Sequence, residues 1–399
     1  MSSPIPTQLR HIFTTGLAMF SMFFGAGNVV FPLIVGQMAG DQAWVAIIGL
    51  LITAVGVPFL GLLAMVLYEG DYHAFFARIG RIPGFLVTLF IMILIGPFGA
   101  TPRCIAFAYS TLKMYDATLS TVLFSFISCI VIYLATYKKS RITDLLGTVL
   151  SPLLVLSLVV IIIKGILCHP TSPHSAFDAA EMFKFGLLEG YNTMDLLGTF
   201  FFSGVIIAGL RQIGGEINSD KRLLARYALQ ASIIGATLLG LVYAGFVLVA
   251  SYYGSALATV PAEVLLGTIA HMVLGQIGGI FVSLAVVLAC LTTALALAAV
   301  FAEFLHNQLF FKVVCYRSSL VLTLLTTFIF ANLKFTEIVA MLIPILIVIY
   351  PVLLVLTIMN ILHKLYGVSM VKTPVVLATI ASIIWYHVPE VLAHIGVAI

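Results

Sequence analysis

Residues 12–40 read IFTTGLAMFSMFFGAGNVVFPLIVGQMAG and contain no charged side chain. A helix of about 20 apolar residues crosses a bilayer, so this run is long enough to do so. It also exceeds the roughly 7–15 apolar residues of a cleavable signal, and we therefore expect a retained membrane helix. Gly25 and Gly27 lie near its middle and Pro32 follows, a combination that predicts an interruption of the helix.

The composition of the whole chain indicates a membrane protein. Hydrophobic residues make up 62% of the 399 residues and charged residues only 9%, whereas a soluble domain carries about 25% charged residues. A helix forms its backbone hydrogen bonds within one segment, so it can span lipid without closing into a barrel. We therefore expect an all-α polytopic membrane protein with eleven or twelve transmembrane helices. The charge-free runs are 12–40, 43–68, 82–102, 119–137, 145–163, 196–210, 227–262, 264–302, 318–333, 338–362 and 373–389.

Positive charges are distributed unequally between the connections. With the N-terminus in the cytoplasm, 14 Lys and Arg residues fall on the cytoplasmic side, including Lys138, Lys139 and Arg141. Only four fall on the outer side: Lys113, Lys164, Lys184 and Lys334. This asymmetry follows the positive-inside rule and predicts the orientation.

The first ten crossings divide into two halves of five, and an odd number gives the halves opposite orientations. The predicted divisions are a cytoplasmic N-terminus 1–11, a first repeat 12–168, an extracytoplasmic connection 169–189, a second, inverted repeat 190–363, and a peripheral C-terminal helix and tail 364–399. Each half opens with a glycine-bearing helix, and we expect the second to be interrupted at Ser203 and Gly204. Paired interruptions point to a midplane transport site, although glycine also serves helix packing.

An interrupted helix in lipid leaves backbone groups that cost several kcal/mol each if unmet. A half-helix N-terminus suits a carboxylate, and a C-terminus suits an ammonium group or a sodium ion. An amino acid zwitterion with a cation meets both demands. Asn28 adds an amide, Phe201 and Phe202 add an apolar wall, and Ser203 adds a hydroxyl. Core or lipid packing is the alternative role of the aromatic residues.

Polar residues inside the spans are further candidates. Thr292 and Thr293 could ligate a hard cation through oxygen, or bond carbonyls of their own helix. Arg103 follows the Gly- and Pro-rich stretch 96–102, and Asp195 opens the sixth helix. We expect a gate or structural role for both, because charges within membrane spans are rarely incidental; an interfacial, solvated Asp195 is the alternative.

Other function classes find no support in the sequence. It contains no HExxH, GxSxG or GxxxxGK[ST] motif, so we expect no enzyme. A channel would show a repeated filter segment or rings of charge. We expect no nucleic-acid partner, no ATPase subunit and no cofactor.

These motifs resemble the branched-chain amino acid:cation symporter family, the bacterial carriers for leucine, isoleucine and valine. The matching stretches are FSMFFGAGNVVFP at 20–32, GP at 96–97 with TPR at 101–103, EGYNTMD at 189–195, LACLTT at 288–293 with AE at 302–303, and Pro344 with Tyr350 and Pro351. The resemblance implies a five-plus-five inverted-repeat (LeuT-like) fold with discontinuous helices 1 and 6. It also implies sodium-coupled symport with alternating access in a bacterial cytoplasmic (inner) membrane. A proton-coupled carrier for another apolar amino acid is the alternative.

The resemblance also implies ligands. The Ala26 and Gly27 amides would receive the substrate carboxylate, and the Phe23 and Phe202 carbonyls its ammonium. With the candidates above, the substrate-binding set is Phe23, Gly25, Ala26, Gly27, Asn28, Phe201, Phe202, Ser203 and Gly204. Sodium, the co-transported cation, would be held by the Ser21, Phe24 and Ala289 carbonyls and the Thr292 and Thr293 hydroxyls. The sequence Cys104-Ile105-Ala106 departs from the small and hydroxyl residues expected after Arg103.

Overall fold

The computed structural model describes residues 7–137, 151–168, 173–211 and 220–394, and the regular structure in these ranges is helical. The longer helices are α1 (Thr7–Phe23), α2 (Ala26–Ala39), α3 (Ala43–Leu51), α4 (Val57–Leu67), α6 (Arg81–Ile95), α7 (Ala100–Lys113), α8 (Thr121–Thr136), α10 (Ser151–Leu167), α11 (Ala179–Asn192), α12 (Asp195–Arg211), α13 (Lys221–Tyr252), α15 (Leu265–Phe304), α16 (Tyr316–Ala331), α17 (Phe335–Tyr366) and α18 (Lys372–His394). Lys138, Lys139, Arg141 and the start of the run 145–163 lie outside the described residues.

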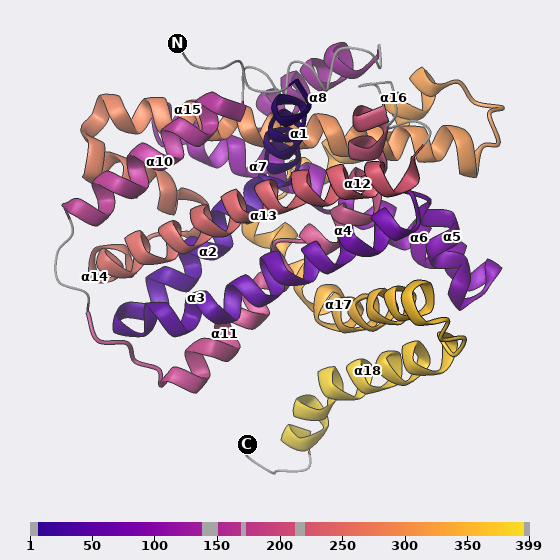
Figure 1. Ribbon diagram of the computed structural model, residues 1–399. Coiled ribbons are helices and arrows are strands. Elements are labelled where there is room, and N and C mark those ends of the chain that lie inside the picture. The colour runs from indigo at the N-terminus through magenta and orange to yellow at the C-terminus, as the bar shows by residue number, and fades with distance from the viewer. Residues whose placement is uncertain (1–6, 138–150, 169–172, 212–219, 395–399) are drawn as a thin grey trace.

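The helices have the length and composition of membrane spans. Five described stretches are long and apolar enough to cross a bilayer, namely Ala26–Leu67, Arg81–Lys113, Arg222–Tyr252, Ala262–Leu309 and Phe335–Tyr366. The pair α11 and α12, bent by 42°, makes a sixth, and α8, α16 and Leu154–Leu167 are shorter apolar helices. Each of the eleven predicted charge-free runs is helical over most of its described length. Figure 1 shows these helices as one bundle, with α18 packed beside α17 at its margin.

The first predicted interruption is confirmed. Helix α1 ends at Phe23 and α2 begins at Ala26. Between them Gly25 is extended, with φ −119° and ψ −164°. A further break separates α6 from α7, because residues 96–99 lie between the two helices and Arg103 falls in the first turn of α7. The interruptions therefore coincide with the glycine-rich stretches of the first and third crossings.

The second predicted interruption is wrong in its position. Helix α12 runs without a break through Ser203 and Gly204. The Ser203 hydroxyl donates to the Phe200 carbonyl within the same helix. A Cβ on Gly204 would lie 3.7 Å from the Gly70 carbonyl oxygen, an ordinary contact distance. Gly204 is therefore a regular helical position without crowding.

The actual break lies between α11 and α12, at Thr193 and Met194. Met194 has φ +66°, an uncommon conformation for a residue other than glycine. Residues 179–189 of the predicted connection form most of α11, which begins where the Asp178 carboxylate accepts from the Glu181 N–H at 2.8 Å. The repeat boundaries themselves stay a prediction.

Candidate functional site

The two breaks meet at a cavity of about 360 Å³. It lies where α1 ends, α2 and α12 begin, and α6, α7 and α15 pass alongside. Its lining residues are Met22, Phe23, Gly25, Ala26, Asn28, Ile95, Ala100, Arg103, Cys104, Thr193, Met194, Asp195, Gly198, Phe202, Thr293 and Leu297. Ligand cavities have mostly apolar walls and a few placed polar groups, and the lining of this cavity has that composition.

Asn28 joins the two breaks. Its Oδ1 accepts the Gly25 N–H at 3.1 Å, which satisfies a backbone donor freed by the first interruption. Its Nδ2 donates to both carboxylate oxygens of Asp195 at 2.8 Å, and it also hydrogen-bonds the Tyr243 hydroxyl. Asn28 therefore lines the cavity as predicted, but both ends of its amide are engaged in holding the two helices together.

Asp195 is a buried carboxylate, 3% exposed, at the first position of α12. The Tyr243 hydroxyl donates to its Oδ2 at 2.8 Å from α13. The adjacent Leu196 N–H donates to the Tyr350 hydroxyl at 3.1 Å. Two tyrosines from α13 and α17 thus fix the start of α12, and Asp195 is buried rather than interfacial.

Arg103 holds the opposite side of the second break. Its Nη1 donates to the Asn192 carbonyl at 2.8 Å and its Nη2 to the Thr193 carbonyl at 3.3 Å. These carbonyls end α11 and would otherwise lack partners. The guanidinium lies 5.5 Å from the centre of the Phe31 ring, and Nε has no hydrogen-bond partner among the described residues. This geometry fits the predicted structural role.

Gly27 makes room for this guanidinium. A Cβ at position 27 would lie 2.5 Å from the Arg103 Nη2 and 3.2 Å from the Thr193 carbonyl oxygen. The two atoms are joined by a hydrogen bond of 3.3 Å, so a shift of the guanidinium would disturb that bond. Gly27 therefore lets α2, α7 and the second break approach one another, although it does not line the cavity.

Three of the five predicted sodium ligands meet at the end of α1. The Thr293 hydroxyl donates to the Phe24 carbonyl at 3.1 Å, and its oxygen lies 3.5 Å from the Ser21 carbonyl oxygen. The Thr292 hydroxyl instead donates to the Ala289 carbonyl of its own helix at 2.7 Å, the alternative that the sequence left open. The structure thus brings hydroxyl and carbonyl oxygens from α15 and α1 together, and their role as ion ligands stays a prediction.

The predicted aromatic wall is only partly formed. Phe23 and Phe202 line the cavity with their rings edge to face, 5.4 Å between centres. Phe201 instead packs on Tyr72 at 5.1 Å, and neither it nor Ser203 nor Gly204 lines the cavity. Phe202 lies inside the unbroken α12, so its ring rather than its carbonyl faces the site. The expected break at Ser203 is absent, and substrate binding by Phe201, Phe202, Ser203 and Gly204 stays a prediction.

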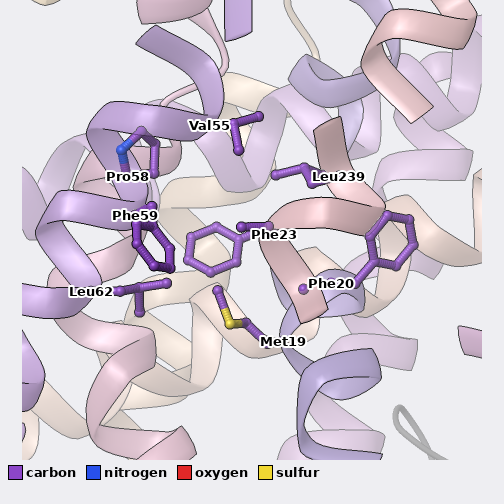
Figure 2. A pocket seen from close by; sticks show the side chains of 10 residues that line it. Met19, Phe20, Phe23, Val55, Pro58, Phe59, Leu62 and Leu239 are labelled. Carbon is purple, nitrogen blue, oxygen red and sulfur yellow. The ribbon is translucent and has the colours of Figure 1, made fainter. Parts of the chain in front are cut away.

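Phe23 also borders a second, smaller pocket of about 290 Å³. Figure 2 shows the Phe23 ring beside Phe59, with Leu62, Val55 and Leu239 around it. The lining of this pocket carries no polar side chain. The phenyl ring is therefore a common wall of an apolar pocket and the polar central cavity.

Tyr243 and Tyr350 are the site residues that the sequence reasoning missed. Both are fully buried and supply hydroxyls to the second break. A tyrosine inside an otherwise apolar span was the available signal, because a buried hydroxyl needs a partner. The sequence pattern singles out Tyr350 only as part of a motif, and it does not single out Tyr243.

Comparison with solved structures identifies the fold. MhsT in complex with L-phenylalanine matches with a TM-score of 0.62 at 14% identity, covering 93% of this chain and 97% of MhsT. Mhp1, a nucleobase-cation-symport-1 family transporter solved in a closed conformation with bromovinylhydantoin bound, matches with a TM-score of 0.59 at 14% identity, covering 94% of this chain and 92% of Mhp1. The predicted all-α, polytopic, LeuT-like fold is thereby confirmed.

Comparison with curated proteins identifies the family. The chain is 31% identical to the branched-chain amino acid transport system 3 carrier protein of Pseudomonas aeruginosa, over 93% of this chain and 85% of the relative. It is 30% identical to the branched-chain amino acid permease BrnQ of Escherichia coli, over 88% and 80%. Such relatives are named permeases and carriers, so the chain is a transporter and not an enzyme. Residues 8–395 match the model of the branched-chain amino acid transport protein family, and the chain therefore belongs to that family.

Proposed function

We propose that this transporter imports leucine, isoleucine and valine by sodium-coupled symport with alternating access. We place it in a bacterial cytoplasmic (inner) membrane with its N-terminus in the cytoplasm, the orientation that the lysines and arginines favour. One observation carries the proposal. The Thr293 hydroxyl meets the Ser21 and Phe24 carbonyls beside a cavity that two broken helices share.

The substrate carboxylate binds at the N-terminus of α2, where the amides of Ala26 and Gly27 point toward the break. A helix N-terminus favours an anion, and the unpartnered Nε of Arg103 lies on the same wall. The ammonium group binds the Phe23 carbonyl and the Asp195 carboxylate, which retains acceptor capacity beyond its three hydrogen bonds. A branched apolar side chain contacts the rings of Phe23 and Phe202.

Sodium takes the place of the hydrogen bond between Thr293 and Phe24. The carbonyls of Ser21 and Ala289 and the hydroxyl of Thr292 complete an all-oxygen set, the type that a hard cation prefers. The ligands come from α1 and α15, so the ion stabilises only a conformation in which these helices are adjacent. That differential affinity is what an ion gradient needs to drive a conformational cycle.

Radiolabelled leucine uptake into proteoliposomes, with and without an inward sodium gradient, tests the proposal. We expect the gradient to raise initial uptake about tenfold or more, since about 1.4 kcal/mol of ion free energy corresponds to a factor of ten. Thr293→Val should raise the sodium concentration needed for half-maximal uptake. Thr323→Val, which removes a buried hydroxyl bonded within α16, is the matched control. Equal uptake with and without sodium would remove sodium coupling, and uptake of an unrelated solute alone would remove the substrate assignment.

A proton-coupled carrier is the second candidate. The observation in its favour is Asp195, a buried carboxylate on the cavity wall whose side-chain hydrogen bonds come from the neutral residues Asn28 and Tyr243. A proton gradient imposed without sodium distinguishes the two mechanisms. Uptake driven by that gradient and abolished by Asp195→Asn would establish proton coupling in place of sodium coupling.

A further inference from the structure

A cavity of about 900 Å³ lies apart from the central site. It is formed by the end of α7, the short helix η6 (Ala262–Val264), the start of α8 and the junction of α16 with α17. Its polar lining includes Lys113, Lys334, Glu263 and Asn332, and its apolar lining includes Met114, Val264 and Phe335. None of its lining residues belongs to the central cavity.

Two lysines give this cavity a positive wall. Lys113 and Lys334 are two of only four lysines that the proposed orientation places on the outer side. They come from opposite halves of the chain, yet they line one cavity. Within the described ranges no ion pair neutralises either lysine. An anionic group is therefore the complementary occupant of this wall.

Two acceptors in the lining of the same cavity lack donors. Glu263 Oε2 and Asn332 Oδ1 are shielded from solvent and make no hydrogen bond in the described part of the chain. The Asn332 Nδ2 donates to the Phe328 carbonyl at 2.6 Å, which fixes the amide so that Oδ1 is the free end. A buried acceptor without a partner destabilises the protein, because it has lost its hydrogen bonds to water. A ligand that carries N–H donors would remove this cost.

The lysines and the unpartnered acceptors together define the ligand. A bare cation meets the donor-free oxygens but is repelled by two ammonium groups, and an anionic lipid headgroup meets the lysines but is repelled by Glu263. A zwitterion satisfies both sets of side chains, and Met114, Val264 and Phe335 offer an apolar surface for its side chain. We propose that this cavity is an outer binding site that captures an apolar α-amino acid before it enters the central cavity. The carboxylate contacts Lys113 and Lys334, and the ammonium contacts Glu263 and Asn332.

This inference rests on the proposed function for its choice of ligand, and equilibrium binding of radiolabelled leucine to the purified full chain tests it. We expect two leucine molecules per chain. Glu263→Gln and Lys334→Met should each weaken one of the two sites about tenfold or more, because each removes a charge-assisted hydrogen bond to the ligand. Lys164→Met, at an exposed outer lysine that does not line the cavity, is the control and should keep both sites.

The chemistry of the outer site is tested with two analogues of leucine. Isocaproate lacks the amino group and isoamylamine lacks the carboxylate, so each should compete at the outer site about tenfold or more less well than leucine. A single site that Gly27→Ala removes and Glu263→Gln leaves unchanged would overturn the outer site while the proposed function stands. No leucine binding at all would overturn both proposals.

Discussion

The two broken helices reach the same geometry by different means. The first break follows from local sequence, because Gly25 is extended and Gly27 leaves space beside it. The second break contains Thr193 and Met194, with no glycine at the turn, and Met194 adopts φ +66°. Its conformation is held from outside by Arg103 on one side and by Asn28, Tyr243 and Tyr350 on the other.

This difference shows how a membrane helix can be interrupted without a helix-breaking residue. Other helices supply hydrogen-bond partners to the backbone groups freed at Thr193. These tertiary contacts offset the free-energy cost of interrupting a helix in lipid. The first break depends on few partners and the second on many. Loss of one partner should therefore damage the second break more than the first.

Removal of the Arg103 guanidinium should have the largest effect. Arg103→Met leaves the Asn192 and Thr193 carbonyls without their donors and should lower the free energy of unfolding by about 3 kcal/mol or more. Leucine uptake should fall about a hundredfold, the equivalent of about 2.8 kcal/mol. Arg103→Lys keeps the charge but loses the paired donors, so its leucine uptake should lie between that of Arg103→Met and that of the wild type. Uptake and thermal unfolding of Arg103→Met at wild-type levels would show that the second break does not depend on its partners.

A methyl group at Gly27 should have the next largest effect. In Gly27→Ala the new Cβ would lie 2.5 Å from the Arg103 Nη2, so either the guanidinium or α2 must move, at a cost of about 1–3 kcal/mol. Leucine uptake should fall at least severalfold. Gly209→Ala is the matched control, because no atom lies within 4 Å of its Cβ position in α12. It should keep uptake and raise the thermal unfolding temperature slightly, because alanine favours helix. Equal losses of leucine uptake in Gly27→Ala and Gly209→Ala would contradict a specific role for Gly27.

The loss of one hydroxyl from the second break should have a smaller effect. Tyr243→Phe removes the donor at 2.8 Å from Asp195 but leaves Asn28 in place, and should cost about 1–2 kcal/mol of unfolding free energy. Tyr253→Phe removes a hydroxyl bonded to the Cys168 carbonyl at 3.1 Å, away from both breaks. Uptake should be reduced only by Tyr243→Phe. If sodium-driven uptake were unchanged in Tyr243→Phe, Asn28 and Tyr350 alone would be sufficient to hold the start of α12.

A change at the outer ends of the two broken helices should have the smallest effect. Asp41, just after α2, accepts the Ser175 N–H at 2.9 Å and pairs with His174 at 2.7 Å, in the segment that leads to α11. The His174 side chain is 97% exposed, and exposed ion pairs contribute little. Asp41→Asn should therefore change leucine uptake by less than about twofold. A loss as large as that of Gly27→Ala would show that this outer link, rather than the buried contacts, holds the breaks together.

Part of the predicted residue set comes together in the structure. Phe23, Gly25 and Ala26 line the cavity, and Thr293 meets the Ser21 and Phe24 carbonyls across two helices; their roles as ligands stay predictions. Asp195 was correctly placed at the start of a helix, but the break before it was misplaced by about ten residues, because glycine was taken as the marker of interruption. Thr193 and Met194 carry no such marker. No local pattern of residues indicates that Arg103 donates hydrogen bonds to the carbonyls at this break.

The sequence by itself determined that this protein is an all-helical membrane protein, that its first helix is interrupted at Gly25, and where most of its helices lie. These properties depend on local features, namely the absence of charge over long runs and the freedom of glycine. The tertiary structure alone decided where the sixth helix breaks and which side chains form the cavity. Asn28 and Asp195 are 167 positions apart in the sequence, and Arg103 and Asn192 are 89 apart. A hydrogen bond between such residues depends on how the helices pack, which no local pattern of residues records.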